Sequence, residues 1–507
     1  MRNGNEEMRN ACPREIRDGQ PKDAVVDMAD IAGMAETADI AGMADMVVIA
    51  DDITGAAEIA GIAYTMGHQV SLLCASDTAG NCSDTVGNCS DTAGNCSDMA
   101  ENCHDTSAAV TVIATDTRSM TESEAIAETR RIAESFLLPP SSLLPPRNSP
   151  RNFFLLPPSS LLPPRKFPRN SFLLYKKTDS ALRGHVVAEL RALMQAVGYR
   201  RSVYLPANPS KGRIIRHGIY YIKEVRGESR EMRGESREVR EAPIHETAFS
   251  YDPEFPAHTS SMCERFPDAE ASGIVMPDAE TADDIRHAIT HYNDGHTLFA
   301  GAADLFKELL EVRGERQEVG EMLPRRDYSL TSHLSPLTSK SSHLSPLTSK
   351  SSILLLCGST QSRPLDLGIP IAAMPREVYD GQQGADFWLD QLSTPLPHRE
   401  GLGEGPLGSD SLILTIPYTH RTGKSVAIHL RSVMAEMTRR LVARHRPDHL
   451  IIEGGATAWA TLQALGWTSF EVTGQIAPGV VQMRSVTSGV LVTLKPGSYP
   501  WGGLFKV

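Results

Sequence analysis

Short apolar runs alternate with amphipathic segments along most of the chain. Before residue 311, six runs have the length and composition of buried strands, and four segments between them repeat apolar residues at helical spacing. We expect strands at 46–50, 110–115, 172–175, 202–205, 273–276 and 297–300, and helices at 56–66, 123–135, 186–197 and 281–291. Strands that alternate with helices in this way predict a doubly wound, mostly parallel sheet.

A second block with the same alternation begins at residue 353. Its predicted elements are strands at 353–357, 412–416 and 449–452, helices at 424–445 and 458–465, and a β-rich tail over 470–507. The expected fold class is therefore α/β with two domains. An N-terminal doubly wound sheet is followed by a C-terminal α/β domain, and low-complexity repeats interrupt both.

Tandem repeats of several different periods separate these blocks. Their copies are too few and too short for a solenoid, and their composition cannot form a packed core, so we interpret them as expanded loops. The charged repeat near residue 230 favours a solvated helical excursion. We expect an N-terminal extension at 1–45, a first domain at 46–311 with insertions at 76–106, 137–171 and 223–242, a linker at 312–352 and a second domain at 353–507.

Composition excludes several classes of protein. The formal net charge of −12 argues against a nucleic-acid-binding surface. The chain has no secretory signal, and proline interrupts its longest apolar runs well before the roughly 18 residues of a membrane helix, so we expect a soluble cytoplasmic protein. Four of the eight cysteines recur every seven residues, whereas zinc sites pair cysteines two to four apart; repeat expansion is the favoured reading for Cys82, Cys89, Cys96 and Cys103.

Two charged phrases follow predicted strands of the first block. The phrase Asp51-Asp52-Ile53-Thr54-Gly55 follows the strand at 46–50, and the phrase from Lys177 to Gly184 follows the strand at 172–175. Ligands of α/β sheets sit at the carboxyl ends of strands, where adjacent carboxylates need hydroxyls, a metal or a cation as partners. A helix cap beside a solvated acid is the plainer reading of the aspartate pair. Together the two phrases suit a small, anionic, hydroxylated substrate.

Glycine-centred turns follow the strands of the second block. They are Gly358-Ser359, Gly454-Gly455-Ala456-Thr457, and Gly479 together with Lys495-Pro496-Gly497. Such a turn before a helix presents free N–H groups and a partial positive charge to phosphate, although each is also compatible with a plain strand–helix turn. Thr457 is a hydroxyl donor or only a helix cap, and Lys495 is a phosphate contact or a solvated lysine. The chain has no P-loop and no protein-kinase signature, so a nucleotide site here is of another type.

Several segments, taken jointly, resemble the four-carbon acid sugar kinase family. They occur in the family's order at 49–56, 177–184, 206–209 with Gly212, Arg213 and Gly218, 277–279 and 454–458. The resemblance implies an N-terminal domain that binds the acid sugar and a C-terminal domain that binds ATP. The implied enzyme is a carbohydrate-acid kinase that transfers the γ-phosphoryl group of ATP to the terminal hydroxyl of threonate, erythronate or a 3-oxo-tetronate. ATP and Mg²⁺ are the implied cofactors.

Phosphoryl transfer needs positioning and charge neutralisation, which gives each candidate residue a role. Arg183 is expected to clamp the substrate carboxylate as a fork, unless it only pairs with Asp179. One carboxylate of the aspartate pair is the general base, and we assign the catalytic roles to Asp52 and Arg183. The predicted substrate-binding residues are Asp51, Asp52, Thr54, Lys177, Asp179, Arg183 and Arg213. The predicted ATP-binding residues are Ser359, Gly454, Gly455, Thr457, Gly479, Lys495 and Gly497.

Mg²⁺ is expected to bind through phosphates and one or two carboxylates, and the sequence assigns no particular ligand. Two other functions compete with the kinase. An aspartate-nucleophile phosphatase has its acids spaced Asp-x-Asp-x-Thr, whereas this chain reads Asp-Asp-x-Thr. A protein that only binds an acid sugar and ATP is the alternative if the repeats abolish turnover. A homodimer is a further hypothesis about partners.

Overall fold

The computed structural model describes residues 46–75, 109–135, 173–226, 238–252, 254–321, 352–358, 367–393, 411–421, 423–497, 499 and 501. Several predictions lie outside the described residues. They concern the extension at 1–45, the insertions at 76–106 and 137–171, the repeated cysteines, most of the linker at 312–352, and Ser359.

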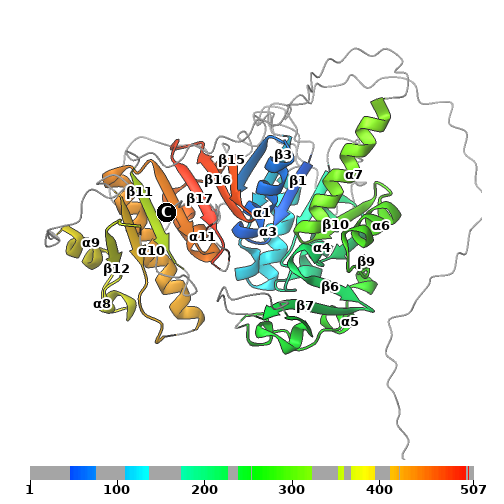
Figure 1. Cartoon of the computed structure of the whole chain (residues 1–507), viewed down its shortest axis with the longest axis horizontal. Helices are drawn as coiled ribbons and strands as arrows, with labels where there is room; N and C mark the ends of the chain where they lie inside the picture. Colours follow the sequence, from blue (N-terminus) through cyan, green and yellow to red (C-terminus); the bar gives the residue numbers. More distant parts are fainter. Residues whose placement is uncertain are drawn as a thin grey trace, which may run out of the picture.

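Within the described residues, one sheet of fourteen strands runs through both halves of the molecule (Figure 1). From edge to edge its strands are β12 (Ile371–Ala373), β13 (Leu412–Thr415), β11 (Ile353–Cys357), β14 (His449–Glu453), β17 (Leu491–Lys495), β16 (Val480–Ser485), β15 (Ser469–Ala477), β2 (Val70–Cys74), β3 (Val110–Ala114), β1 (Met46–Ala50), β4 (Leu173–Lys177), β10 (Thr297–Gly301), β5 (Arg201–Leu205) and β9 (Ile274–Val275).

The N-terminal half of the sheet, from β2 to β9, is parallel throughout. β1 lies between β3 and β4 in register, so that Ala50, Ala114 and Lys177 end level with one another. Chain connections leave β1 toward β2 on one side and reach β4 on the other, which makes the end of β1 a topological switch point. This parallel α/β arrangement confirms the expected fold class.

Helices cover both faces of this half. Its longer helices are α1 (Ile53–Thr65), α3 (Glu122–Ser135), α4 (Val186–Val197), α6 (Ala282–Tyr292) and α7 (Ala303–Glu321). Lys176 contacts Glu189 of α4, whereas Lys177 lies near Glu58 of α1. Because successive residues of a strand point to opposite faces, α4 and α1 cover opposite faces of the sheet. Helix α7 continues to Glu321, beyond the start of the linker expected at 312–352.

The C-terminal half joins the same sheet through an antiparallel ribbon. β14 pairs in parallel with β11 on one side and with β17 on the other. β17, β16 and β15 then pair with one another in antiparallel order, and β15 pairs antiparallel with β2. The helices of this half are α8 (Arg376–Tyr379), α9 (Ala385–Ser393), α10 (Lys424–His445) and α11 (Gly455–Leu465). Since β2 belongs to the N-terminal half, hydrogen bonds of one sheet hold the two halves together.

A small second sheet corrects the interpretation of the charged repeat. β6 (Arg213–Arg216), β7 (Ile219–Arg226) and β8 (Glu238–Pro243) form an antiparallel sheet, so both ends of the helical excursion expected over 223–242 are strands, and its centre at 227–237 lies outside the described residues. Tyr220 and Ile222 of β7 are buried, whereas their neighbours are half-buried. This period of two at the start of β7 directs the following charged residues into a strand. β2, with the apolar run Val70–Cys74, was not among the predicted strands.

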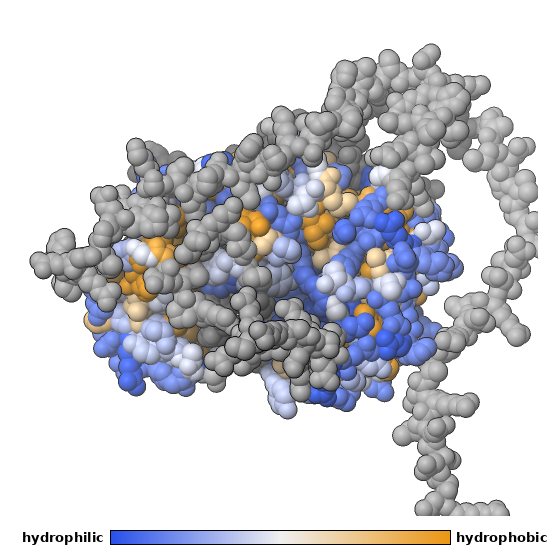
Figure 2. Space-filling model, in the orientation of Figure 1, coloured by the Kyte–Doolittle hydropathy of each residue, from blue (hydrophilic) through white to orange (hydrophobic). Residues whose placement is uncertain are grey.

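The described surface around α6 and β7 is mostly hydrophilic (Figure 2). Apolar residues gather in the interior instead, along both faces of the large sheet, where Val48, Ile49 and Tyr175 are fully buried. Among the described residues, no helix has both the length and the apolar character that a membrane span requires.

Candidate functional site

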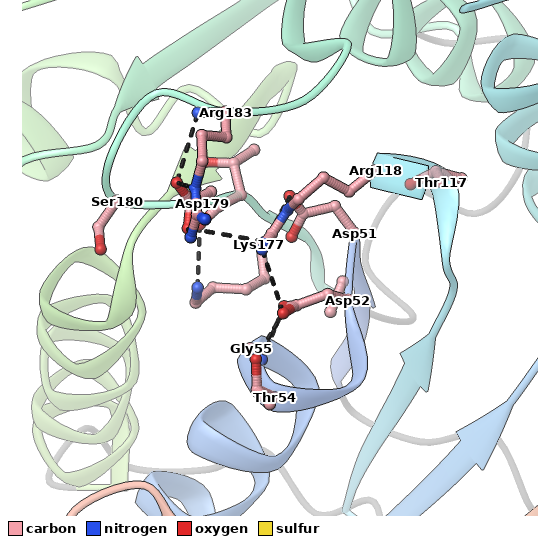
Figure 3. A network of polar contacts seen from close by, with 12 residues as sticks. Asp51, Asp52, Thr54, Gly55, Thr117, Arg118, Lys177, Asp179, Ser180 and Arg183 are labelled. Atoms are coloured by element: carbon pink, nitrogen blue, oxygen red, sulfur yellow. Dashed lines mark hydrogen bonds and ion pairs between the residues drawn. The ribbon is translucent and has the colours of Figure 1, made fainter. Parts of the chain in front are cut away.

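The acidic turn lies at the level ends of β1, β3 and β4. The Asp51 N–H donates to the Lys177 carbonyl over 3.3 Å, and the Arg118 N–H donates to the Asp51 carbonyl over 3.4 Å. These backbone bonds bring the residues that follow three neighbouring strands onto one edge (Figure 3). The two charged phrases of the sequence, which lie over 120 residues apart, therefore meet as predicted for the carboxyl ends of a parallel sheet.

Arg118 is a residue of this site that the sequence did not reveal. It belongs to the short helix η1 (Thr117–Ser119) after β3. Its Nη2 lies 2.9 Å from Asp51 Oδ2 and 3.7 Å from Asp179 Oδ1, and its Nη1 lies 3.2 Å from Asp52 Oδ2. One guanidinium thus joins three carboxylates. The strand predicted at 110–115 was the available signal, because its end had to adjoin the other two.

The two adjacent aspartates have different surroundings. Asp52 caps α1, since its Oδ1 accepts from the Gly55 N–H at 2.8 Å and its Oδ2 accepts from the Thr54 hydroxyl. The helix-cap reading is therefore correct for Asp52, although it also binds Arg118. Asp51 is 2% exposed, and within the part of the chain that the structure describes only Oδ2 of its carboxylate has hydrogen-bond partners.

The pKa values of the two aspartates move in opposite directions. Burial raises the pKa of Asp51 above its usual value against the opposing charge of Arg118, and the neighbouring Asp52 raises it further. Burial acts on Asp52 as well, but Arg118, Lys177 and the Thr54 hydroxyl outweigh it and lower that pKa. The pair therefore contains one stable carboxylate and one with greater proton affinity.

Asp179 and Arg183 form a two-bond ion pair. Arg183 Nε and Nη2 donate to the two oxygens of Asp179 at 2.8 and 2.9 Å, and Nη1 lies 3.4 Å from Asp252 Oδ2. Although burial opposes it, the charges of Arg118 and Arg183 hold the pKa of Asp179 far below its usual range. The pairing that competed with the substrate clamp is thus present, and the clamp itself stays a prediction.

Arg213 and Lys177 complete the cationic side of the site. Arg213 donates to the Ser180 hydroxyl. The ring of Phe249 lies 5.6 Å from the Arg213 guanidinium and 5.9 Å from that of Arg183. The buried Lys177 donates to the Thr178 carbonyl at 2.9 Å. The structure therefore gathers Asp51, Asp52, Thr54, Lys177, Asp179, Arg183 and Arg213 in one region.

A buried polar network lies beneath this region. The side chains of Lys176 and Glu189 are 1% and 2% exposed and form an ion pair of 2.6 Å. The hydroxyl of Thr117, next to Arg118, donates to the same Glu189 oxygen at 2.9 Å. The network connects β4, α4 and η1, so it supports the backbone from which Arg118 extends.

The strand ends of the C-terminal half carry a different set of groups. Cys357, Glu453 and Lys495 end β11, β14 and β17 in register. Gly454 then adopts φ +98°, a conformation that favours glycine, and α11 begins without a side-chain cap. An uncapped helix start leaves N–H groups for an anion such as phosphate.

Lys495 is buried rather than solvated. It is 2% exposed and pairs with Glu453, which is 1% exposed; it also donates to the carbonyls of Pro496 and Gly497 at 3.1 and 3.2 Å. Its ammonium lies 4.7 Å from the Trp501 ring centroid. The solvated-lysine interpretation is therefore wrong, and a phosphate contact stays a prediction.

The remaining glycines of this half are positions of close packing. A Cβ on Gly358 would lie 2.2 Å from the Thr457 hydroxyl, and one on Gly479 would lie 2.4 Å from the Tyr499 ring. Thr457 therefore holds the turn after β11 against α11, and Gly479 leaves room for an aromatic side chain. Their contacts with ATP stay predictions.

The two strand-end regions contact each other. A Cβ on Gly455 would lie 2.7 Å from Thr54 Cγ2, so the glycine turn rests on the acidic turn. Lys211 binds both Glu58 of α1 and Tyr499 of the C-terminal tail. Among the described residues, no group of three or more His, Cys, Asp and Glu side chains could hold a metal ion.

Comparisons with known proteins agree with this division. A sugar-binding N-terminal domain model matches residues 46–141 and 165–267, and a nucleotide-binding C-terminal domain model matches residues 416–499. No curated protein matches the sequence. Two solved structures share the fold at 16% identity. One, from Salmonella typhimurium LT2 with a provisional description as a tRNA synthase, has a TM-score of 0.55 and covers 90% of this chain and 96% of its own.

The second solved structure is protein HI1011 of Haemophilus influenzae, which is described by the family model DUF1537. Its TM-score is 0.50, and the alignment covers 91% of this chain and 98% of that protein. The two domain matches follow each other in the order sugar-binding, then nucleotide-binding, which is the order of the two strand-end regions. The chain therefore belongs to the four-carbon acid sugar kinase family.

Proposed function

We propose that this protein is an ATP-dependent kinase that phosphorylates the terminal 4-hydroxyl of a four-carbon acid sugar such as threonate, erythronate or a 3-oxo-tetronate. The supporting observation is the contact between Gly455 and Thr54. It places the glycine turn of the nucleotide-binding domain against the acidic turn of the sugar-binding domain. Direct transfer between two bound substrates requires such proximity.

The sugar-binding side suits a small hydroxylated anion. Arg183 and Arg213 both lie close to the Phe249 ring, at 5.9 and 5.6 Å from its centroid, and supply positive charge for a carboxylate. The longest side-chain hydrogen bond of Arg183 is the 3.4 Å contact of Nη1 with Asp252. Nη1 is therefore the nitrogen that would most easily exchange this partner for a bound ligand. Asp52, to which the sequence assigned a catalytic role, binds Arg118 and Thr54 beside the proposed substrate site, and Lys177 adds positive charge.

The nucleotide-binding side suits phosphate. The uncapped start of α11 and the left-handed Gly454 offer backbone N–H groups, and Gly455, Thr457, Lys495 and Gly497 surround that turn. ATP supplies the phosphoryl group, and Mg²⁺ neutralises charge on its phosphates. Because Mg²⁺ in such sites binds mainly through phosphates and water, the absence of a three-ligand cluster among the described residues is compatible with it. A cytoplasmic location and a homodimer stay predictions.

The proposal is tested by ADP release. The purified protein is assayed with Mg-ATP against D-threonate, L-threonate, D-erythronate and their 3-oxo relatives. We expect turnover with one of these acids, and its identity gives the stereochemistry. If ATP raises the melting temperature but no acid is phosphorylated, the protein only binds these ligands. A stable phosphoryl-analogue adduct on an aspartate would instead identify a phosphatase.

The same assay tests the clamp. Arg183→Ala should raise the Michaelis constant for the acid at least roughly tenfold, since a bond to a charged group is worth about 1.5–3 kcal/mol. Arg216→Ala is the matched control, because Arg216 lies on β6 and pairs with Glu241 and Glu280. An unchanged Michaelis constant in Arg183→Ala would remove Arg183 from the substrate site.

A further inference from the structure

A buried side-chain oxygen of the acidic turn, Asp51 Oδ1, has no hydrogen-bond partner among the described residues, and Asp51 is 2% exposed. Buried polar atoms in native proteins are nearly always paired. The hydroxyls of Thr178 and Tyr204, which interact with each other, lie nearby: Thr178 directly follows Lys177, whose carbonyl binds the Asp51 N–H, and the charge of Asp51 acts on the Tyr204 hydroxyl. A hydroxyl group of a bound ligand would supply the missing partner of Asp51 Oδ1.

Only Asp51 within this group can accept a proton at neutral pH. Arg118 Nε and Nη2 both bind Asp51 Oδ2, at 3.2 and 2.9 Å, so the guanidinium fixes the carboxylate by one oxygen and leaves Oδ1 available. In Asp52 both oxygens are in use, one by the Gly55 N–H and the other by Thr54 and Arg118. A general base needs a lone pair that reaches the substrate.

We propose that Asp51, rather than Asp52, is the general base that takes the proton from the attacking hydroxyl, and that Asp52 is a positioning residue. This inference rests on the proposed kinase function and revises the assignment of Asp52 made from the sequence. The hydroxyl proton of the acid sugar moves to Asp51 Oδ1, and the oxygen forms a bond to the γ-phosphorus of ATP. The bond from that phosphorus to the bridging oxygen breaks, and its electron pair leaves with ADP. The proton on Asp51 returns to solvent after product release.

The surroundings of Asp51 favour this role. The groups that face it are Asp52 on its own strand end, Arg118 on η1, Lys176 and Lys177 on β4, Asp179 in the next loop, and Tyr204 on β5. Burial and Asp52 raise the pKa of Asp51, whereas Arg118 and the two lysines oppose the rise. The resulting proton affinity exceeds that of Asp52, whose pKa is lowered. A stronger base accepts the proton of an alcohol more readily.

The test compares Asp51→Asn with Asp52→Asn, two isosteric changes one residue apart. Asp51→Asn should lower kcat by roughly 10²–10⁴-fold while the Michaelis constants change little. The fall of kcat at low pH (the acid limb of the profile), which reports protonation of the base, should disappear in this variant. Asp52→Asn keeps an oxygen that can cap α1, so it should lose less kcat and retain the acid limb. The inference is overturned if Asp51→Asn keeps its kcat, or if Asp52→Asn abolishes the acid limb instead.

A second variant covers a failure of Asp51→Asn to fold. Asp51→Ala leaves a space beside Arg118, and formate added to it should restore part of the turnover, whereas Asp52→Ala should show no such rescue. Wild-type protein that phosphorylates no acid would refute the proposed function itself, which separates that failure from a failure of the Asp51 assignment.

The pH dependence of stability tests the difference between Asp51 and Asp52 without an activity assay. Because the folded-state pKa of Asp51 is raised, its contribution to stability is fully present at low pH and is lost as the pH rises through that pKa. The melting temperature of Asp51→Asn relative to wild type should therefore increase as the pH is raised from 4 to 8. For Asp52→Asn the difference should stay nearly constant from pH 4 to 8 and shrink only on further acidification, since the lowered pKa of Asp52 places its titration below the usual value of 3.8. A flat difference for Asp51→Asn would contradict the assignment.

Discussion

The two strand-end regions of this protein are built from different chemical groups. At the ends of β1, β3 and β4, side chains of opposite charge interlock around Arg118. At the ends of β11, β14 and β17, glycine turns lie over a buried ion pair of Lys495 and Glu453. Charged side chains suit a small anion whose carboxylate and hydroxyls need directed bonds, whereas backbone N–H groups and a helix start suit phosphate. The first region should be sensitive to loss of charge, and the second to added volume.

The largest effect is expected in the network beneath the first region. Glu189→Gln leaves the buried Lys176 without its partner, and breaking a buried pair on one side costs about 3–5 kcal/mol. Denaturant unfolding should show a loss of that size. Arg439→Gln, which breaks an exposed pair with Glu436 on α10, is the control and should cost less than about 1 kcal/mol. Equal losses of free energy in the two variants would mean that the buried ion pair stabilises the fold no more than an exposed one.

The next largest effect is expected at Arg118. Lysine cannot reach three carboxylates with one planar group, so Arg118→Lys should reduce the free energy of unfolding by about 1.5–3 kcal/mol. The catalytic efficiency with the acid sugar should fall at least roughly tenfold. Arg131→Lys on α3 changes an exposed pair with Glu128 and serves as the control in both measurements. An unchanged free energy of unfolding and an unchanged catalytic efficiency in Arg118→Lys would show that the fork geometry of the guanidinium is unimportant.

The sequence predicted the two charged phrases of the first region but not Arg118, which joins them. The acidic turn and the phrase from Lys177 to Gly184 were readable because charges follow clear apolar strands. Arg118 was missed because it lies four residues beyond the end of β3, among polar residues with no distinguishing pattern. Only the strand order, which places β3 beside β1, brings it to the aspartates. Strand order is a long-range property that local periodicity does not contain.

The second region shows a different limit of sequence-based prediction. The glycine turns and the helix at α11 were predicted, but the role of Lys495 depends on Glu453, which is 42 residues away on a neighbouring strand. The charged repeat was predicted as helix because alternating charge suits a solvated helix. The two ends of that excursion that the structure describes are strands instead, since β7 pairs with β6 and β8 and buries Tyr220 and Ile222. Tertiary contacts decided both cases.

A smaller effect should distinguish the second region from the first. Gly455→Ala adds a methyl group 2.7 Å from Thr54 Cγ2, and such overpacking costs about 1–3 kcal/mol. We expect a lower melting temperature and weaker ATP binding in calorimetry. Thr54→Ser removes the methyl group that would clash, so the double variant should recover much of the loss. Gly314→Ala, on the open side of α7, is the control and should be neutral or stabilising.

The smallest effect is expected where the C-terminal tail touches the sugar-binding half. Tyr499→Phe removes the hydroxyl that binds Lys211, but Lys211 keeps Glu58, so the loss should be about 0.5–1 kcal/mol. Burial lowers the pKa of Lys211, but Glu58 and Tyr499 outweigh it and raise that pKa, so the lysine stays charged and the loss should be the same at pH 6 and pH 9. Unfolding at both values checks this. A loss that grew with pH would mean that Lys211 releases its proton in this range. The contact between the halves would then depend on a titrating lysine instead of on the glycine turn.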